Sequence, residues 1–175
     1  MGRGGSVVPR PSSWILDGLG NRLSNKFLKT GVLDYLQESV RITLEAVKAT
    51  PQDNSDPAGR LNNFGNHLDE RYSRTGAIGD LEEAIRVVNE AVETMPPDEP
   101  EQAKFLNNLG NKFGKRYWRI EAMSDLEEAI RIKRQAVKMI PPGHPDFPAT
   151  LNNVAVPLRD KFSRSDVIDD FEEAI

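Results

Sequence analysis

The chain has 175 residues and a net charge of −4; 38% of its residues are hydrophobic and 29% are charged. It has no basic excess to neutralise phosphates, which argues against nucleic acid as the main ligand, and no apolar run near the roughly 20 residues that span a bilayer. The absence of cysteine excludes disulfides, thiolate metal sites and cysteine nucleophiles. Because the N-terminus also lacks the apolar stretch of a signal peptide, we expect a cytoplasmic protein that binds neither nucleic acid nor a membrane.

Residues 1–11 are rich in glycine and proline, and we expect them to form a disordered tail. From residue 12 onward a phrase led by leucine returns every 45 residues, at Leu16, Leu61, Leu106 and Leu151. A fixed period of roughly 20–50 residues is typical of stacked supersecondary units rather than of one closed core. We therefore predict one array over residues 12–175, with repeats at about 12–56, 57–101 and 102–146 and an incomplete repeat at 147–175.

The third repeat shows best that each unit holds two helices. Within residues 101–119 the large apolar side chains are spaced three and four positions apart, as one stripe of an α-helix requires: Leu106, Leu109, Phe113 and Tyr117. A second stripe follows within residues 124–140. Proline-rich segments such as 141–145 separate the units, because proline cannot continue a helix. The sequence therefore predicts an all-α array of antiparallel helix pairs.

Two further features carry predictions about packing. Glycine returns at one site of the first helix, as Gly20, Gly65 and Gly110; it costs roughly 1 kcal/mol there relative to alanine, so we expect a neighbouring helix to approach closely. In the fourth repeat Pro157 should kink or interrupt the first helix. The chain then stops at Ile175 within the second helix. We expect a piece of a longer array, able to self-associate through this incomplete C-terminal repeat.

The third repeat resembles the tetratricopeptide repeat (TPR). The phrase Leu106-x2-Leu109-Gly110-x2-Phe113, followed by Ala129, Ala136 and Pro141, fits the family signature with leucine for tryptophan and phenylalanine for tyrosine. The usual period is about 34 residues, so this is a long variant.

Two sub-types of the family are most similar. Gly143-His144-Pro145-Asp146 upstream of Leu151-Asn152-Asn153 is similar to repeats of kinesin light chains. Arg74-Thr75-Gly76 followed by residues 80–85 is similar to long repeats of fungal and bacterial proteins that carry a caspase-like CHAT domain. The resemblance implies a right-handed α-solenoid, the TPR superhelix, whose first helices line a concave groove.

Asparagines of the first helices are the main candidates for contact with a ligand. Stacked repeats align equivalent positions in rows, and an amide offers an acceptor and two donors that match a peptide unit. We predict that four of them hold the main chain of an extended peptide, as the resemblance to kinesin light chains also implies: Asn62, Asn66, Asn107 and Asn111. The alternative is that such amides bond between repeats and fix the stack, a role we favour for Asn63, Asn108 and Asn153.

Two other residues of the third repeat would add selectivity. Trp118 stands where the other repeats have leucine or serine, so the fold does not require tryptophan; it either anchors a ligand or caps the turn before the second helix. Lys115 lies at the edge of the asparagine arc and, with Arg116 or Arg119, would supply part of a clamp for an acidic ligand tail.

The remaining charged residues form columns across the repeats. The basic column is Lys26, Arg71, Arg116 and Lys161, and paired glutamates form an acidic one; we interpret both as a solvated face with local ion pairs. His67 and His144 do not recur, and neither has a nucleophile or metal partner at ligand spacing. We expect both histidines on the surface.

We therefore predict a non-catalytic scaffold, without cofactor or metal, that binds an extended peptide or a partner helix in its concave groove. The alternative is that the array is the sensor arm of a longer multidomain protein, such as a CHAT-type peptidase, whose catalytic domain lies outside this chain.

Overall fold

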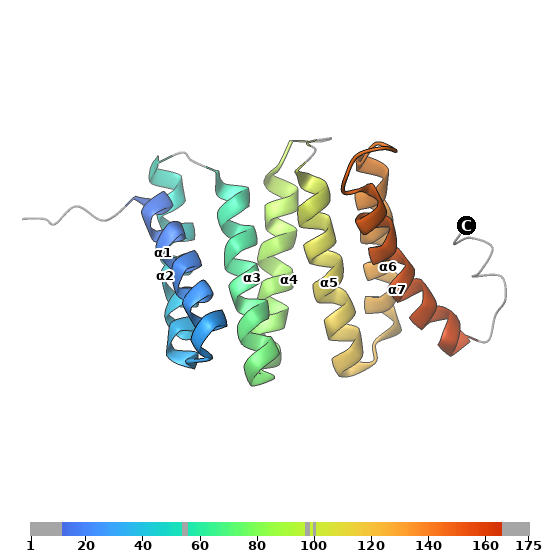
Figure 1. The fold of residues 1–175 in the computed structure, drawn as a ribbon, viewed down its shortest axis with the longest axis horizontal. Coiled ribbons are helices and arrows are strands. Elements are labelled where there is room, and N and C mark those ends of the chain that lie inside the picture. The colour runs from blue at the N-terminus through green and yellow to red at the C-terminus, as the bar shows by residue number, and fades with distance from the viewer. Residues whose placement is uncertain (1–11, 54–55, 97–98, 100, 166–175) are drawn as a thin grey trace, which may run out of the picture.

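The structure, a computed structural model, describes residues 12–53, 56–96, 99 and 101–165. These residues form seven helices and no strand (Figure 1). The helices are α1 (Ser13–Thr30), α2 (Leu33–Asp53), α3 (Pro57–Thr75), α4 (Ile78–Thr94), α5 (Gln102–Ile120), α6 (Met123–Met139) and α7 (Phe147–Ser165). The expected tail at residues 1–11 and the last part of the fourth repeat, 166–175, lie outside the described residues. Within the described part, no helix combines the length and apolarity that crossing a bilayer demands.

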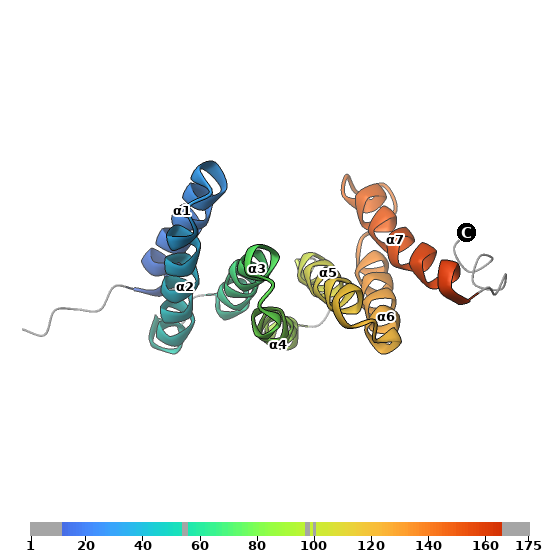
Figure 2. The same ribbon diagram turned by 90° about the horizontal axis from the view of Figure 1, so that it is seen from below.

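The helices stack as hairpins, α1 with α2, α3 with α4 and α5 with α6. Figure 2 shows α1, α3, α5 and α7 in one layer and α2, α4 and α6 in the other, with the first layer on the inner side of a gentle curve. We call these the inner and outer layers. The predicted all-α solenoid of helix pairs is confirmed.

Local sequence explains the turns within the hairpins. Gly31 and Gly76 end α1 and α3 with φ angles of 69° and 71°, a left-handed conformation that glycine adopts without steric cost. In each case the glycine amide donates to the carbonyl four residues earlier. At the start of α3, Asp56 accepts a hydrogen bond from the Gly59 amide at 2.8 Å, and Pro57 occupies the first turn, where its missing N–H is not needed.

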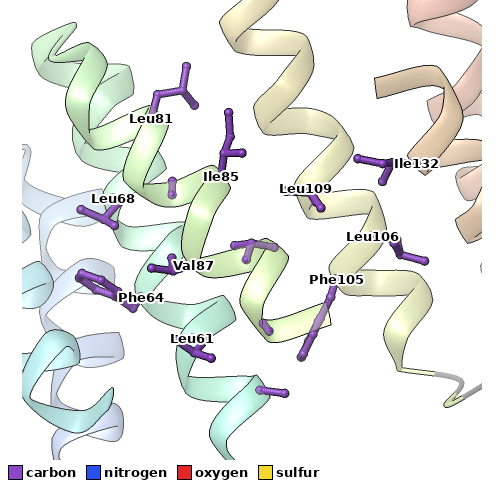
Figure 3. Packing of buried hydrophobic residues seen from close by; sticks show 14 of the residues in the cluster. Leu61, Phe64, Leu68, Leu81, Ile85, Val87, Phe105, Leu106, Leu109 and Ile132 are labelled. Atoms are coloured by element: carbon purple, nitrogen blue, oxygen red, sulfur yellow. The ribbon is translucent and has the colours of Figure 1, made fainter. Parts of the chain in front are cut away.

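A hydrophobic core runs between the two layers and through α2 to α6 (Figure 3). Its side chains come from the predicted stripes, such as Leu106 and Leu109 of α5 against Ile132 of α6. A smaller cluster joins Tyr117 to the first half of α6, with Leu158 as its contribution from α7. The described part of α7 also buries Val154.

The recurring glycines confirm the predicted close approach of helices. A Cβ at Gly20 would clash with Thr43, and a Cβ at Gly65 would clash with Val88. At Gly110 the new Cβ would lie 2.7 Å from Cγ of Lys133. Each glycine thus lets the second helix of its own hairpin pack directly on the backbone of the first.

Pro157 does not interrupt its helix: α7 continues from Phe147 to Ser165 with the proline inside it. Proline has no N–H, so the carbonyl of Asn153, four residues earlier, loses its usual helical donor. Lys133 of α6 supplies a replacement, because its Nζ donates to the Asn153 carbonyl oxygen at 3.0 Å. Of the two expected outcomes, a kink or an interruption, the interruption is wrong, and the Lys133 side chain satisfies the carbonyl that the proline cannot.

Candidate functional site on the inner layer of helices

Side chains of neighbouring inner helices bond to each other across the repeats. From α1 to α3, both carboxylate oxygens of Asp17 accept from the Asn63 amide, at 3.0 and 3.1 Å. From α3 to α5, the Asn108 amide donates to Oδ1 of Asn62 at 3.0 Å, and Nζ of Lys112 donates to Oδ1 of Asn66 at 2.9 Å. Every one of these pairs is 46 residues apart in sequence. We call such a bond a rung, and we call the contact between two successive inner helices a step.

The α3–α5 step has a third rung, which is an ion pair. Nζ of Lys115 lies 2.7 and 2.8 Å from the two carboxylate oxygens of Asp69 and 3.1 Å from Oγ of Ser73. Lys115 is partly exposed, but its ammonium already has three acceptors within the array. Its first role is therefore to join two repeats, and any contact with a ligand must share the charge with Asp69.

These rungs correct part of the prediction for the asparagines. Asn62 is only 3% exposed, and its oxygen is taken by Asn108, so it is not available to hold a peptide. Asn66 is half-buried and is bonded to Lys112. The structural role predicted for Asn63 and Asn108 is confirmed. The sequence aligned the right amides, but the side-chain oxygens of those in α3 are taken by bonds to the next repeat.

The step from α5 to α7 lacks the corresponding rungs among the described residues. Oδ1 of Asn107 is buried and has no hydrogen-bond partner within the described part of the chain. Asn111 is exposed, and the residue 46 positions further on is Pro157, which has no polar side chain to offer. Asn111 is therefore exposed without a rung, whereas the unpaired oxygen of Asn107 is buried.

Two cavities open along this same step. One of about 450 Å³ lies beside Asn107 and Asn153 and extends to the end of α6 and to the loop at 140–146. The other, of about 330 Å³, is lined by Asn111, Lys115 and Trp118 together with residues of α6 and α7. The structure thus brings together three predicted residues, Asn111, Lys115 and Trp118, and places Asn107 in the neighbouring cavity.

Trp118 projects from α5 and is 60% exposed. Its ring meets that of Tyr117 edge to face, with centroids 5.4 Å apart, a favourable arrangement for aromatic pairs. Tyr117 is itself buried in the cluster beneath, so it fixes one edge of the indole. Trp118 also lines the smaller cavity.

Three basic side chains on the helices of the array are buried, which the sequence analysis did not predict: His67, Lys112 and Lys133. His67 is buried, contrary to the expected surface position, with Nδ1 3.4 Å from Oγ1 of Thr43; burial lowers its pKa from 6.5 to about 4. Lys112 is buried, and desolvation lowers its pKa to about 8. Burial also lowers the pKa of Lys133. For Lys133 the missed signal was a charged residue at a repeat position that Val88 and Thr43 occupy elsewhere.

Two members of the basic column make the local ion pairs that we predicted, but their carboxylate partners are largely buried rather than part of a solvated face. Arg71 and Arg116 form bidentate ion pairs with Asp80 and Asp125, across the turn of their own hairpins. The guanidinium of Arg116 is therefore bonded to Asp125 and does not join Lys115 in binding an acidic ligand tail.

His144 is exposed as predicted. Within the described ranges, no three His, Asp or Glu side chains gather as a metal site.

Comparisons with known proteins agree with this architecture. Residues 103–146, which span α5, α6 and the following loop, match the model of the Tetratricopeptide repeat family. No curated protein sequence matches the chain.

Among solved structures, the chain is similar to a set of nearly identical TPR-like repeats from Podosopora anserina, described as a putative kinesin light chain. The two share 14% identity with a TM-score of 0.65, over 95% of this chain and 76% of that one. A second structure of those repeats gives 14% identity and 0.65 over 94% and 75%. The de novo designed helical repeat protein DHR64 is similar at 14% identity and 0.53, over 93% and 88%. At such identities the likeness concerns the fold. The family model thus matches one repeat of the array, and the likeness to these structures shows that the described chain shares the fold of such repeats.

Proposed function

We propose that this array of tetratricopeptide repeats is a non-catalytic scaffold that binds an extended peptide or a partner helix along its inner layer. Helical repeat proteins generally act by presenting an extended surface to other proteins. The observation that carries the proposal here is that, within the described helices, Asn107 and Asn111 have no rung while the equivalent residues of α3 do. Polar groups left unpaired beside a cavity favour a ligand that can pair with them.

A phage-displayed library of random peptides tests the proposal and requires no identified partner. We expect enrichment of peptides that bind the folded array and lose affinity when Asn111, exposed on the inner layer, is changed to arginine. The matched control is Asn89→Arg, because Asn89 is exposed on α4 of the outer layer. Failure to enrich any peptide, or equal loss with both variants, contradicts the proposal.

Self-association is a second candidate, favoured by one observation at the other end of the array. Leu19 of α1 is exposed, whereas its repeat equivalents Phe64 and Leu109 are buried in the hydrophobic core. We propose that the last helices of a second copy stack on this face; the C-terminal residues predicted from the sequence for this role lie outside the described residues. Light scattering tests it: Leu19→Lys should convert an oligomer to a monomer, and a wild-type chain that is monomeric at high concentration contradicts it.

A further inference from the structure

We propose that the outer side of α6 is a docking surface for a short acidic segment of a partner protein. The surface is a row of cations on one face of this helix, which we call the basic stripe: Arg131, Arg134 and Lys138. Because it belongs to the outer layer of helices, the inference goes beyond the proposed function and does not depend on it.

The helical period turns the basic stripe away from the inner layer. Its members are three and four residues apart, so they share one face of the helix. The opposite face is buried, and there Lys133 packs against Gly110 of α5. Arg131 and Lys138 are exposed and Arg134 is half-buried, so a ligand on the outer side of the array can reach the stripe.

The equivalent turn of α4 shows that the fold does not require cations here. Three positions differ between the two outer helices: Asn89, Glu90 and Glu93 in α4 correspond to Arg134, Gln135 and Lys138 in α6. The two glutamates give this turn of α4 a charge of −2, and the arginine and lysine give that of α6 a charge of +2. Since the chain as a whole carries −4, its composition does not explain the basic stripe.

Glutamates balance the arginine of α4 more fully than that of α6. Arg86 of α4 is held between two glutamates, at 2.7 and 3.0 Å. Its equivalent Arg131 pairs with Glu128 at 2.6 Å, and Gln135 stands where α4 has the second glutamate. Like charges three and four residues apart destabilise a helix, so an anion that binds along the stripe relieves a repulsion within α6.

Helix electrostatics account for only one member of the pair at the end of the stripe. Lys138 lies in the last turn of α6, where a cation gains from the helix dipole. Arg134 lies about one turn earlier, where this effect has fallen off. The dipole therefore explains Lys138 and leaves Arg134 to another role.

Two hollows beside the basic stripe give a ligand room. One of about 480 Å³ is lined by the whole stripe together with Glu127, Gln135 and Lys161 of α7. The second, of about 390 Å³, shares Gln135 and Lys138 with the first and extends to Gln102 of α5. The larger hollow is therefore bordered by cations from two helices and by a single carboxylate.

Carboxylates close together on a protein segment fit this arrangement best. Guanidinium groups pair bidentately with carboxylates, and the amide of Gln135 offers donors and an acceptor to a main chain. The stripe spans about 10 Å, which matches about three residues of an extended segment. A longer polyanion such as nucleic acid or an anionic membrane would extend over α4, the neighbouring outer helix (Figure 2), where Glu90 and Glu93 repel it.

Fluorescence anisotropy of labelled hexaglutamate, titrated with the full chain, tests the proposal, and hexaglutamine is the uncharged reference peptide. We expect hexaglutamate to bind and hexaglutamine not to bind. The affinity should fall as salt is added, because ions screen the attraction. If hexaglutamate does not bind, or if hexaglutamine binds equally well, the proposal is overturned.

The decisive variant transfers the α4 residues to α6: Arg134→Asn, Gln135→Glu and Lys138→Glu. The matched control, Arg41→Glu with Lys48→Glu, changes the net charge by the same amount at exposed positions of α2, also in the outer layer. We expect the transfer to weaken hexaglutamate binding at least about tenfold and the control to change it by less than about twofold. Equal losses would show that only the overall charge matters and would overturn the proposal.

Thermal unfolding verifies that both variants fold, and Lys138→Glu alone replaces the transfer if that variant does not, with an expected loss of about threefold. Duplex DNA or phosphatidylserine vesicles serve as competing probes. If either binds more tightly than hexaglutamate and loses this affinity in the transfer variant, the partner is not a protein segment. If hexaglutamate binds only after the Asp and Glu residues of 166–175 are changed to Asn and Gln, the chain's own acidic residues are the occupant, and the proposal is likewise overturned.

Discussion

The α3–α5 and α5–α7 steps of the inner layer begin from equivalent residues and end differently. In the first, Asn62 and Asn66 are bonded to Asn108 and Lys112 of the next helix. In the second, the equivalent Asn107 and Asn111 make no such bond to the described part of α7, and cavities take the place of the rungs. The residue type at a repeat position therefore does not decide whether it fixes the stack or faces a ligand; its partner in the next repeat does.

The largest predicted effect is a loss of folding stability in acid, caused by His67. This histidine is buried in α3, at the repeat position where α7 has Pro157. Its pKa falls from 6.5 unfolded to about 4 in the fold, so the unfolded state binds the proton more tightly between these values. Stability should therefore fall as pH drops from 6.5 to 4, by about 3 kcal/mol in total. Urea unfolding of wild type and His67→Gln across this range should show a steeper loss for wild type; parallel curves would refute the assignment.

A pair of glycines probes the difference in space directly. Gly65→Ala places a methyl group against Val88, and against the carbonyl of Ala84 at 3.3 Å, so we expect a loss of about 2 kcal/mol despite the better helix propensity of alanine. Gly114, which lines the open step, has nothing within 4 Å of a new Cβ. Gly114→Ala should stabilise by about 1 kcal/mol. Thermal unfolding measures both, and a loss at Gly114 would mean that the step is closed in solution.

The asparagines themselves give the third contrast. Asn62→Leu removes the acceptor of the Asn108 amide, and we expect it to destabilise by about 1.5 kcal/mol. Asn107→Leu removes an acceptor that has no partner in the described part of the chain, so it should be neutral or slightly stabilising in the absence of ligand. Denaturant unfolding of the two variants decides the matter: equal losses would show that Asn107 makes an internal rung after all.

The smallest expected effect is the coupling between Lys133 and Pro157. Lys133→Met leaves the Asn153 carbonyl unpaired in the presence of the proline, but in a Pro157→Ala background the new amide pairs with that carbonyl. A double-mutant cycle by urea unfolding should give a coupling of about 1 kcal/mol. Additive losses would show that the bond at 3.0 Å does not compensate for the proline.

The apolar stripes were sufficient to predict the helices of the array. The stripe at Leu106 and Leu109 places α5, and the proline-rich segments mark the ends of the hairpins, because these signals act within a few residues of chain. The close approach of the second helix to Gly20 and Gly65 was also predicted. Glycine lowers helix propensity, so its return at the same repeat position indicates that a neighbouring helix packs there. The uninterrupted α7 was not, because its missing donor is replaced by a side chain from another helix.

The candidate site was predicted only in part, and the reason is visible in α3 and α5. Asn107, Asn111 and Trp118 lie at the cavities, but Asn62 and Asn66 have the same sequence signature and are consumed by rungs. The buried His67, Lys112 and Lys133 were missed because a charged residue in a helix is usually exposed, and only a neighbour that covers it reverses that expectation.

The amino-acid sequence by itself determined the two helices in each unit and the sites where glycine lets helices touch. Periodicity and proline position are properties of the chain read in one dimension. Only the tertiary structure decided which polar side chains meet, because that depends on how far one helix is shifted along the next. With pairs 46 residues apart, the partner of an asparagine lies in another repeat, and a single proline there changes a stacking contact into an open step.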